Sequence, residues 1–148
     1  MASPDNRLYS LLEKYKGFID VTTKIPVRDK ESLSLVYSPG VGHACMAIKK
    51  DIKEVFELTN KANSLIIITD GSAYPSKTDQ QNFHMLPMME PLAIFYKQVY
   101  NIDTYPLVMD ISQGESPEEE FETLFNLAPA HAGFELYGYN KDKLKGLL

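Results

Sequence analysis

Histidine and cysteine are the side chains that most often hold metal ions or act as nucleophiles, and this chain has three histidines and one cysteine. His43, His84 and His131 share no metal-ligand spacing, so each is expected to be a surface or locally hydrogen-bonded residue. Cys45 alone allows neither an intrachain disulfide nor a multi-cysteine metal site. No base lies beside Cys45 in the sequence, which favours a buried helix residue over a nucleophile.

A carboxylate follows the most apolar run of the chain, residues 64–70, which ends at Asp70-Gly71. A continuous apolar run of this length predicts a strand buried on both faces, as in a parallel sheet. The simplest role for Asp70 is to cap the turn after that strand. The nearby Met85, Met88 and Met89 are expected to fill the core and not to bind a ligand.

The N-terminal half should be mainly helical. Ser3-Pro4 predicts a helix start, and Gly17 is a plausible end. A short strand is expected at 18–22, and 24–40, with two prolines, is expected to be irregular. A short helix is predicted for 41–50 and another from Asp51 to about Asn60, whose inward-facing residues would be Ile52, Val55, Phe56 and Thr59.

The C-terminal half alternates strands with helices. Residues 71–82 form a polar loop, and 83–100 are helical in pattern, with Pro91 expected to kink the helix or open a new one. A second buried strand is predicted at 104–110 and a third at 133–139, with a helix between them starting at Ser116-Pro117. The pattern predicts an α/β fold, a parallel sheet covered by helices on both faces.

The composition indicates one ordinary globular domain. The chain has 148 residues, 44% of them hydrophobic, with a net charge of -5 and a pI near 5.2. We therefore expect a single domain over 1–148, with a core over about 10–140 and a charged tail over 141–148. The acidic balance argues against nucleic acid, and the lack of a long apolar run argues against membrane insertion. The N-terminus lacks a signal-peptide core, which favours a cytoplasmic or an uncleaved mitochondrial protein over a secreted one.

Several motifs in order resemble the N-terminal domain of the bacterial-type malic enzymes. The similar segments are 24–41 (KIPVRDKESLSLVYSPGV), 57–73 (ELTNKANSLIIITDGSA), 86–97 (LPMMEPLAIFYK), 101–110 (NIDTYPLVMD) and 127–139 (LAPAHAGFELYGY). The resemblance implies a three-layer α/β/α fold with a small, mainly parallel sheet, like the amino-acid-dehydrogenase-type N-terminal domain of malic enzymes. It also implies a substrate cleft that would include Tyr37, Pro39, Gly40 and Asp70.

The family's acid–base residues are only partly present. Malic enzymes oxidise and decarboxylate malate with a tyrosine as general acid and a lysine as base, and Tyr37 matches the tyrosine. Leu92 occupies the lysine position, and an aliphatic side chain cannot exchange a proton. Lys97 lies elsewhere on the helix and is expected to be a surface residue. Tyr37 is therefore interpreted as a vestigial site residue and not as a catalytic one.

The family's metal ligands and glycine-rich turn are also replaced. Tyr137 and Gly138 stand where two metal-binding carboxylates are implied, and rescue of that site by Glu135 is considered unlikely on the strand pattern. Side chains fill 74–81, where the family has a glycine-rich run that lets the backbone approach ligands. We therefore expect neither a metal nor a cofactor.

These losses predict a non-catalytic relative, not an enzyme, that serves as a structural or interaction subunit of a larger assembly or a homo-oligomer. Two alternatives stay open. One is a module that binds a small dicarboxylate such as malate or pyruvate. The other is the substrate-domain part of a split malic enzyme, with another chain supplying the cofactor domain.

Overall fold

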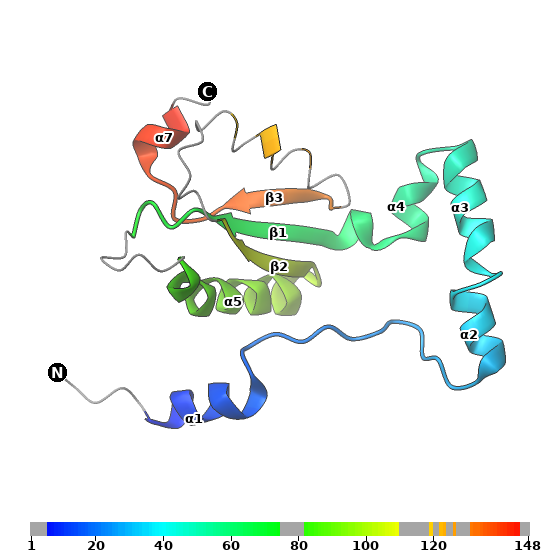
Figure 1. The fold of residues 1–148 in the computed structure, drawn as a ribbon, viewed down its shortest axis with the longest axis horizontal. Coiled ribbons are helices and arrows are strands. Elements are labelled where there is room, and N and C mark those ends of the chain that lie inside the picture. Colours follow the sequence, from blue (N-terminus) through cyan, green and yellow to red (C-terminus); the bar gives the residue numbers. More distant parts are fainter. Residues whose placement is uncertain are drawn as a thin grey trace. The chain divides into compact units, whose positions relative to one another are not determined.

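A computed structural model describes residues 6–74, 82–109, 119, 122, 123, 126 and 131–145 (Figure 1). The chain forms two compact units. The first contains residues 1–19 and 63–148, and the second contains residues 20–62. The expected N-cap Ser3 and most of the expected helix after Ser116 fall outside the described residues.

The first unit is built on a three-stranded parallel sheet. Strand β1 (Ser64–Thr69) lies between β2 (Asp103–Val108) and β3 (Gly133–Leu136), and Ile67 aligns with Pro106 on one side and with Glu135 on the other. The three strands predicted from apolar runs and the α/β fold class are confirmed, although each strand is shorter than predicted. Pro106 can be accommodated because β2 is an edge strand, where a missing backbone N–H costs no ladder bond on the open side.

Side chains of β1 point alternately to the two faces of the sheet and bury both. Ile66 and Ile68 pack with Tyr139 on one face, and Ile67 packs with Met85 and Met89 on the other. The core role predicted for the methionines is thus confirmed for Met85 and Met89, whereas Met88 is 43% exposed. Burial of a side chain of this size stabilises the fold by about 1.5–3 kcal/mol, so β1 organises the unit.

Helix α5 (Leu86–Phe95) packs against the sheet and follows a short 3-10 turn, η2 (Phe83–Met85). Pro91 lies inside α5 without ending it, and a π-helical turn, η3 (Tyr96–Tyr100), closes the segment. At this end the Tyr96 hydroxyl donates to Glu135 Oε2 of β3 at 2.6 Å. This hydrogen bond joins the end of the helix to an edge strand.

Helix α1 (Asn6–Tyr15) ends in two residues with positive φ, Lys16 and Gly17. The next amide, Phe18 N, donates to Glu90 Oε2 of α5 at 2.8 Å. The strand predicted at 18–22 is wrong. Among the described residues no strand pairs with this segment, and the carboxylate of Glu90 takes the hydrogen bond that a neighbouring strand would have accepted.

The second unit consists of helices α2 (Lys30–Val36), α3 (Val41–Lys50) and α4 (Glu54–Leu58), with the 3-10 turn η1 (Asn60–Asn63) leading to β1. The prediction of helix 41–50 is confirmed. The irregular structure predicted for 24–40 is wrong, because Asp29 and Ser32 form a reciprocal capping box that starts α2.

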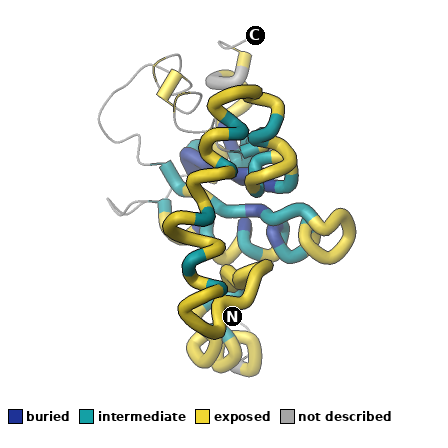
Figure 2. The backbone as a smooth tube through the Cα atoms, turned by 90° about the vertical axis from the view of Figure 1, so that its right-hand side faces the viewer, coloured by how far each residue is buried: buried dark blue, intermediate teal, exposed yellow. Residues whose placement is uncertain are grey.

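The packing predicted for this unit is also wrong in part. Ile52 and Phe56 were expected to face inward and are 71% and 48% exposed, and Cys45, expected to be buried, is exposed. No residue from Asp20 to Ala62 is buried (Figure 2). The helix predicted from Asp51 to about Asn60 is present only as the shorter α4, and within this unit there is no core for its apolar face to pack against.

The end of the chain contains a short helix, α7 (Lys141–Lys145), within the stretch predicted to be a charged tail. None of the helices in the described ranges has the length and apolar character required to cross a bilayer.

A tight turn follows β1 at Gly71, which is buried and has φ +70°. A Cβ atom added at Gly71 would overlap the side chain of Asn82, whose Nδ2 donates to the Asp70 carbonyl oxygen at 2.6 Å. The turn therefore requires glycine, both for its backbone conformation and for its packing.

We expect Gly71→Ala to lower the free energy of unfolding by about 3 kcal/mol, through left-handed backbone strain and overpacking. Gly42→Ala is the matched control, because Gly42 is helical and an added Cβ meets no atom within 4 Å. That control should be neutral or stabilising by up to about 1 kcal/mol in chemical denaturation. Equal effects of the two substitutions would contradict the description of this turn.

Removal of the Tyr96 hydroxyl leaves the part-buried Glu135 carboxylate without this donor. Tyr96→Phe should destabilise the protein by about 1–2 kcal/mol, measured by thermal or chemical denaturation. Tyr100→Phe, at an exposed ring that contacts Tyr96, should change stability far less. If the two variants lost equal stability, the hydrogen bond would not join α5 to β3.

The same hydrogen bond predicts a dependence on alkaline pH. The hydrogen bond to Glu135, followed by burial, raises the pKa of Tyr96 above its ordinary value of 10.0. A pKa raised by folding gives stability that is complete below pH about 10 and is lost as the pH rises through the folded-state value. Denaturation between pH 9 and about 12 should show a steeper loss in the wild type than in Tyr96→Phe.

Candidate functional site

Ligands of parallel α/β sheets bind at the carboxyl ends of the strands, which makes this edge the place to look for a site. In the first unit Asp70 follows β1, Met109 follows β2 and Tyr137 follows β3. The backbone stays paired past the strands, since Met109 N donates to Thr69 O at 2.8 Å and Tyr137 N donates to Ile68 O at 2.7 Å. The three strand ends are therefore held side by side.

Asp70, a predicted site residue, lies in the first turn after β1 and is 3% exposed. Its Oδ1 accepts a hydrogen bond from Ser72 N at 2.8 Å, and Gly71 N donates to Thr69 Oγ1 at 3.0 Å. A carboxylate that binds the amide two residues later is the geometry of a capped turn. The structure thus gives Asp70 a local structural role at the candidate site.

The loops after β1 and β3 are hydrogen-bonded to each other at this edge. Ala73 N donates to the Gly138 carbonyl oxygen at 2.9 Å, and Asn140 N donates to Ser72 Oγ at 2.8 Å. We call these two segments, Ser72–Tyr74 and Gly138–Asn140, the two-loop clamp. Hydrogen bonds between the loops use groups that could otherwise contact a ligand.

Leu92 and Tyr137 occupy the positions where the resemblance implies the catalytic lysine and a metal carboxylate. Both are partly buried and pack against the same apolar cluster, formed by Ile67, Met85 and Met89. The cluster carries no charge, so it can neither attract a proton from a hydroxyl group nor hold a cation. What it does is attach α5 to the sheet.

A divalent metal does not fit the residues present at these positions. Leu136, Tyr137 and Gly138 offer no anionic oxygen, although hard cations require such ligands. Within the described ranges no group of three or more His, Cys, Asp or Glu side chains could hold a metal ion. A dinucleotide phosphate does not fit the turn after Asp70 either, because Gly71 is followed by Ser72, Ala73 and Tyr74 and not by closely spaced glycines. We derive no chemical step through either group.

The remaining predicted site residues, Tyr37, Pro39 and Gly40, lie between α2 and α3 in the second unit. Tyr37 ends α2, where its amide donates to Leu33 O, and its side chain is 71% exposed. Gly40 lies so close to the Leu35 carbonyl oxygen that a Cβ atom would overlap it. The glycine is therefore explained by this turn, and Tyr37 beside it is an exposed residue.

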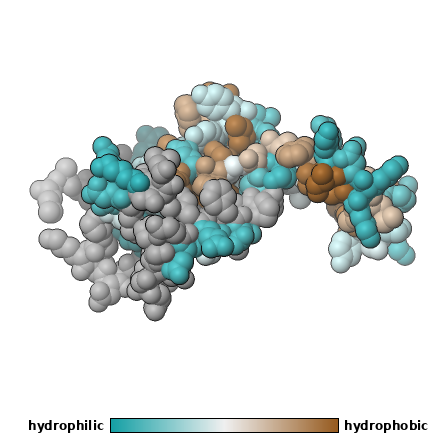
Figure 3. Space-filling model, turned by 90° about the horizontal axis from the view of Figure 1, so that it is seen from above, coloured by the Kyte–Doolittle hydropathy of each residue, from teal (hydrophilic) through white to brown (hydrophobic). Residues whose placement is uncertain are grey.

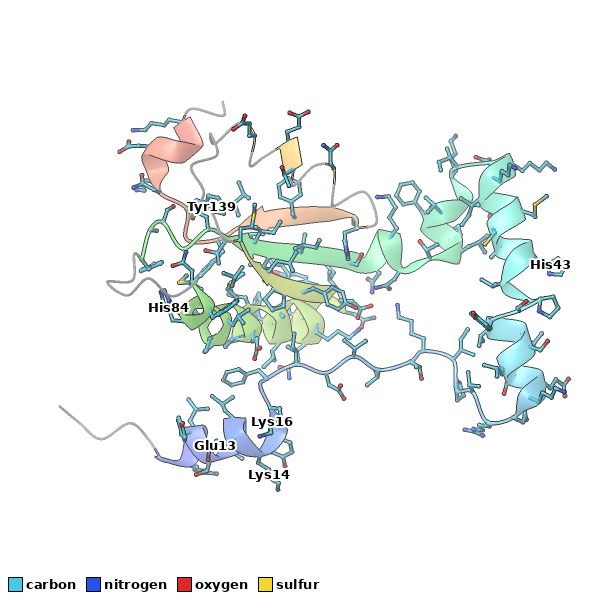
Figure 4. All side chains as sticks on the ribbon, viewed as in Figure 1. Glu13, Lys14, Lys16, His43, His84 and Tyr139 are labelled. Carbon is cyan, nitrogen blue, oxygen red and sulfur yellow. The ribbon has the colours of Figure 1, made fainter. Side chains whose placement is uncertain are left out.

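The histidines lie on separate elements, His43 on α3 and His84 in η2 (Figure 4). His43 Nδ1 lies 3.3 Å from Gly40 O, His84 Nε2 lies 3.3 Å from Tyr74 O, and His131 Nδ1 lies 3.0 Å from Ser64 Oγ. Each imidazole thus has a local partner, as the sequence predicted.

Sequence analysis missed two polar contacts around α5. They are Glu90 with Phe18 N, and Tyr96 with Glu135. Each joins residues separated by dozens of positions, and no local spacing pattern marks such a pair. The helical period does place Tyr96 one turn after Leu92 on the same face of the helix, which is the one available signal.

Comparison with known proteins identifies the relatives of this chain. The family model "Malic enzyme, N-terminal domain" matches residues 16–122. The NAD-dependent malic enzyme of Geobacillus stearothermophilus is 33% identical over 81% of this chain and 24% of its own length. The bifunctional malic/malolactic enzyme of Bacillus subtilis is 31% identical over 82% of this chain and 29% of its own length. The chain therefore spans about a quarter of these relatives.

Solved structures agree. The NAD-dependent malic enzyme of Thermotoga maritima matches with a TM-score of 0.80 and 26% identity, over 95% of this chain and 39% of that chain. A putative malic enzyme, described as a malate oxidoreductase, matches with a TM-score of 0.81 and 28% identity, over 95% and 37%. The curated relatives named above are bacterial, which gives the mitochondrial expectation no support.

The prediction that this protein is not an enzyme is wrong, because the relatives and the matching structures are named as malic enzymes. The physical reason for the error is one of scale. The prediction rested on replaced side chains at a few positions of this chain. In the relatives, the matching region is only about a quarter of the sequence.

The fold, the matched family model and the relatives above 30% identity agree over most of the chain. This chain belongs to the malic enzyme N-terminal domain family.

Proposed function

We propose that this chain is the malate-binding domain of a malic-enzyme assembly, and that partner subunits cover its second unit. The domain would span 1–148 and contribute Tyr37 to the site. The rest of the assembly would supply the dinucleotide-binding part, the base and any metal ligands. The activity would be the oxidative decarboxylation of malate.

The observation that carries the proposal is the lack of a core in residues 20–62. Helices α2, α3 and α4 contain no buried residue. Large apolar side chains are exposed on all three, and Figure 3 shows brown, apolar atoms at the surface of this segment, to the right of the view. Leu35 on α2 and Met46 on α3 are 68% and 67% exposed, and Tyr37 and Ile52, which flank the helices, are both 71% exposed. A segment of this length that buries none of its apolar side chains supports the proposal that a partner surface covers it.

Family membership supports the proposed substrate. The named relatives act as malic enzymes, and this chain keeps the tyrosine of their acid position in Tyr37-Ser38-Pro39-Gly40. Because Leu92, Tyr137 and Gly138 stand at the other implied positions, the base and the metal ligands would come from elsewhere in the proposed assembly. Tyr37 would then be the general acid that this chain supplies to a site shared with the rest of the assembly.

Polar substitution of the exposed apolar helices should break the assembly. Leu35→Glu with Ile52→Glu should weaken subunit association by about tenfold or more, because each buried aliphatic side chain contributes about 1.5–3 kcal/mol. Sedimentation velocity of the purified protein across a range of concentrations measures this. The matched control, Leu35→Met with Ile52→Val, keeps the apolar surface and should keep the assembly. A wild-type chain that stays monomeric and binds no partner from its source would contradict the proposal.

Removal of the Tyr37 hydroxyl should affect chemistry and leave association unchanged. Tyr37→Phe in the native assembly should lower malate-dependent cofactor reduction by at least about 100-fold, the typical contribution of a general acid. Tyr9→Phe, at another exposed tyrosine, is the control and should be neutral. Unchanged turnover in Tyr37→Phe, or an intact assembly without malate turnover, would contradict the role proposed for the domain.

A further inference from the structure

We propose that the two-loop clamp closes the carboxyl edge of the sheet between β1 and β3, so that this edge is packed protein and not a cation site. This inference rests on the geometry around Gly138 and does not depend on the proposed function of the assembly. It concerns the place where the malic enzyme resemblance implies metal ligands.

Gly138 is the centre of the clamp and has φ +66°, a conformation that side chains other than glycine rarely adopt. A Cβ atom at this position would lie 3.3 Å from Met85 Cε, 3.4 Å from Thr69 Oγ1 and 3.4 Å from Tyr74 Cδ2. The three contacts come from η2, from β1 and from the loop after β1. The Cβ atom of any other residue would therefore be in contact with three neighbours at once, most tightly with Met85, in a backbone conformation that favours glycine.

Four oxygen atoms at this edge each accept a hydrogen bond from a backbone amide of the two loops. Thr69 Oγ1 accepts from Gly71 N, Gly138 O accepts from Ala73 N, and Ser72 Oγ accepts from Asn140 N. Asp70 Oδ1 accepts from Ser72 N. A cation bound here would compete with these hydrogen bonds for the same oxygen atoms, and a divalent ion needs several oxygen ligands directed at one point. Hydrogen bonds between the two loops thus occupy the place where the resemblance implies metal coordination.

A double-mutant cycle in the full chain tests the packing around Gly138. Gly138→Ala should lower the Tm, and the loss should be smaller when Tyr74 is replaced by alanine, because the ring then no longer limits the space. A coupling of about 1–2 °C or more is expected for residues in contact. The control cycle pairs Gly42→Ala with Tyr74→Ala and should be additive. Additivity in the Gly138 cycle would overturn the inference.

Titration with Mn²⁺ tests the chemical consequence. The wild-type chain should bind no stoichiometric Mn²⁺ at this edge, measured by electron paramagnetic resonance of the free ion. Tyr137→Glu with Gly138→Asp should also bind none while Tyr74 is present. Stoichiometric Mn²⁺ binding by the wild type that Asp70→Asn abolishes, or by the carboxylate variant with Tyr74 intact, would overturn the proposal. These results do not depend on assembly or on malate turnover, so the two proposals fail separately.

Discussion

Burial of the central strand β1 is the constraint on which the first unit depends. Ile66, Ile67 and Ile68 are at most 5% exposed and bring two clusters together on opposite faces of the sheet. Because β1 pairs with a parallel strand on each side, its end fixes where the loops after Asp70 and Tyr137 meet. The position of β1 therefore determines where the two-loop clamp forms and where Leu92 and Tyr137 pack against the apolar cluster.

Two different kinds of surface result from this architecture. The sheet and α5 enclose a core of their own, so substitutions such as Leu92 and Tyr137 add apolar contacts where the family resemblance implies charge. The helices from Asp20 to Ala62 have no such core, and their stability must come from outside the segment. In our proposal, the chemistry that this chain contributes lies at Tyr37, on the segment that a partner covers.

The parts of the fold that could be predicted are those in which neighbouring residues in the sequence form a clear apolar or alternating pattern. The apolar run before Asp70 predicted β1, and the alternation of strands and helices predicted the parallel sheet. The capping box of α2 was present in the sequence at Asp29 and Ser32 but was overlooked because of the prolines that flank it. The exposure of Ile52 and Phe56 could not be predicted, because the helical period shows which face is apolar and not what covers it. Nor did any residue pattern predict the bond between Tyr96 and Glu135, whose partners meet only through the packing of α5 on the sheet.

Hydrogen exchange of residues 20–62, followed by mass spectrometry over a dilution series of the native assembly, tests the central claim most directly. If partner subunits cover this unit, its amides should be protected at high concentration and should lose that protection as the assembly dissociates, while β1 stays protected throughout. Equal protection of residues 20–62 in the dissociated monomer would show that the chain covers this segment itself, and would contradict the account.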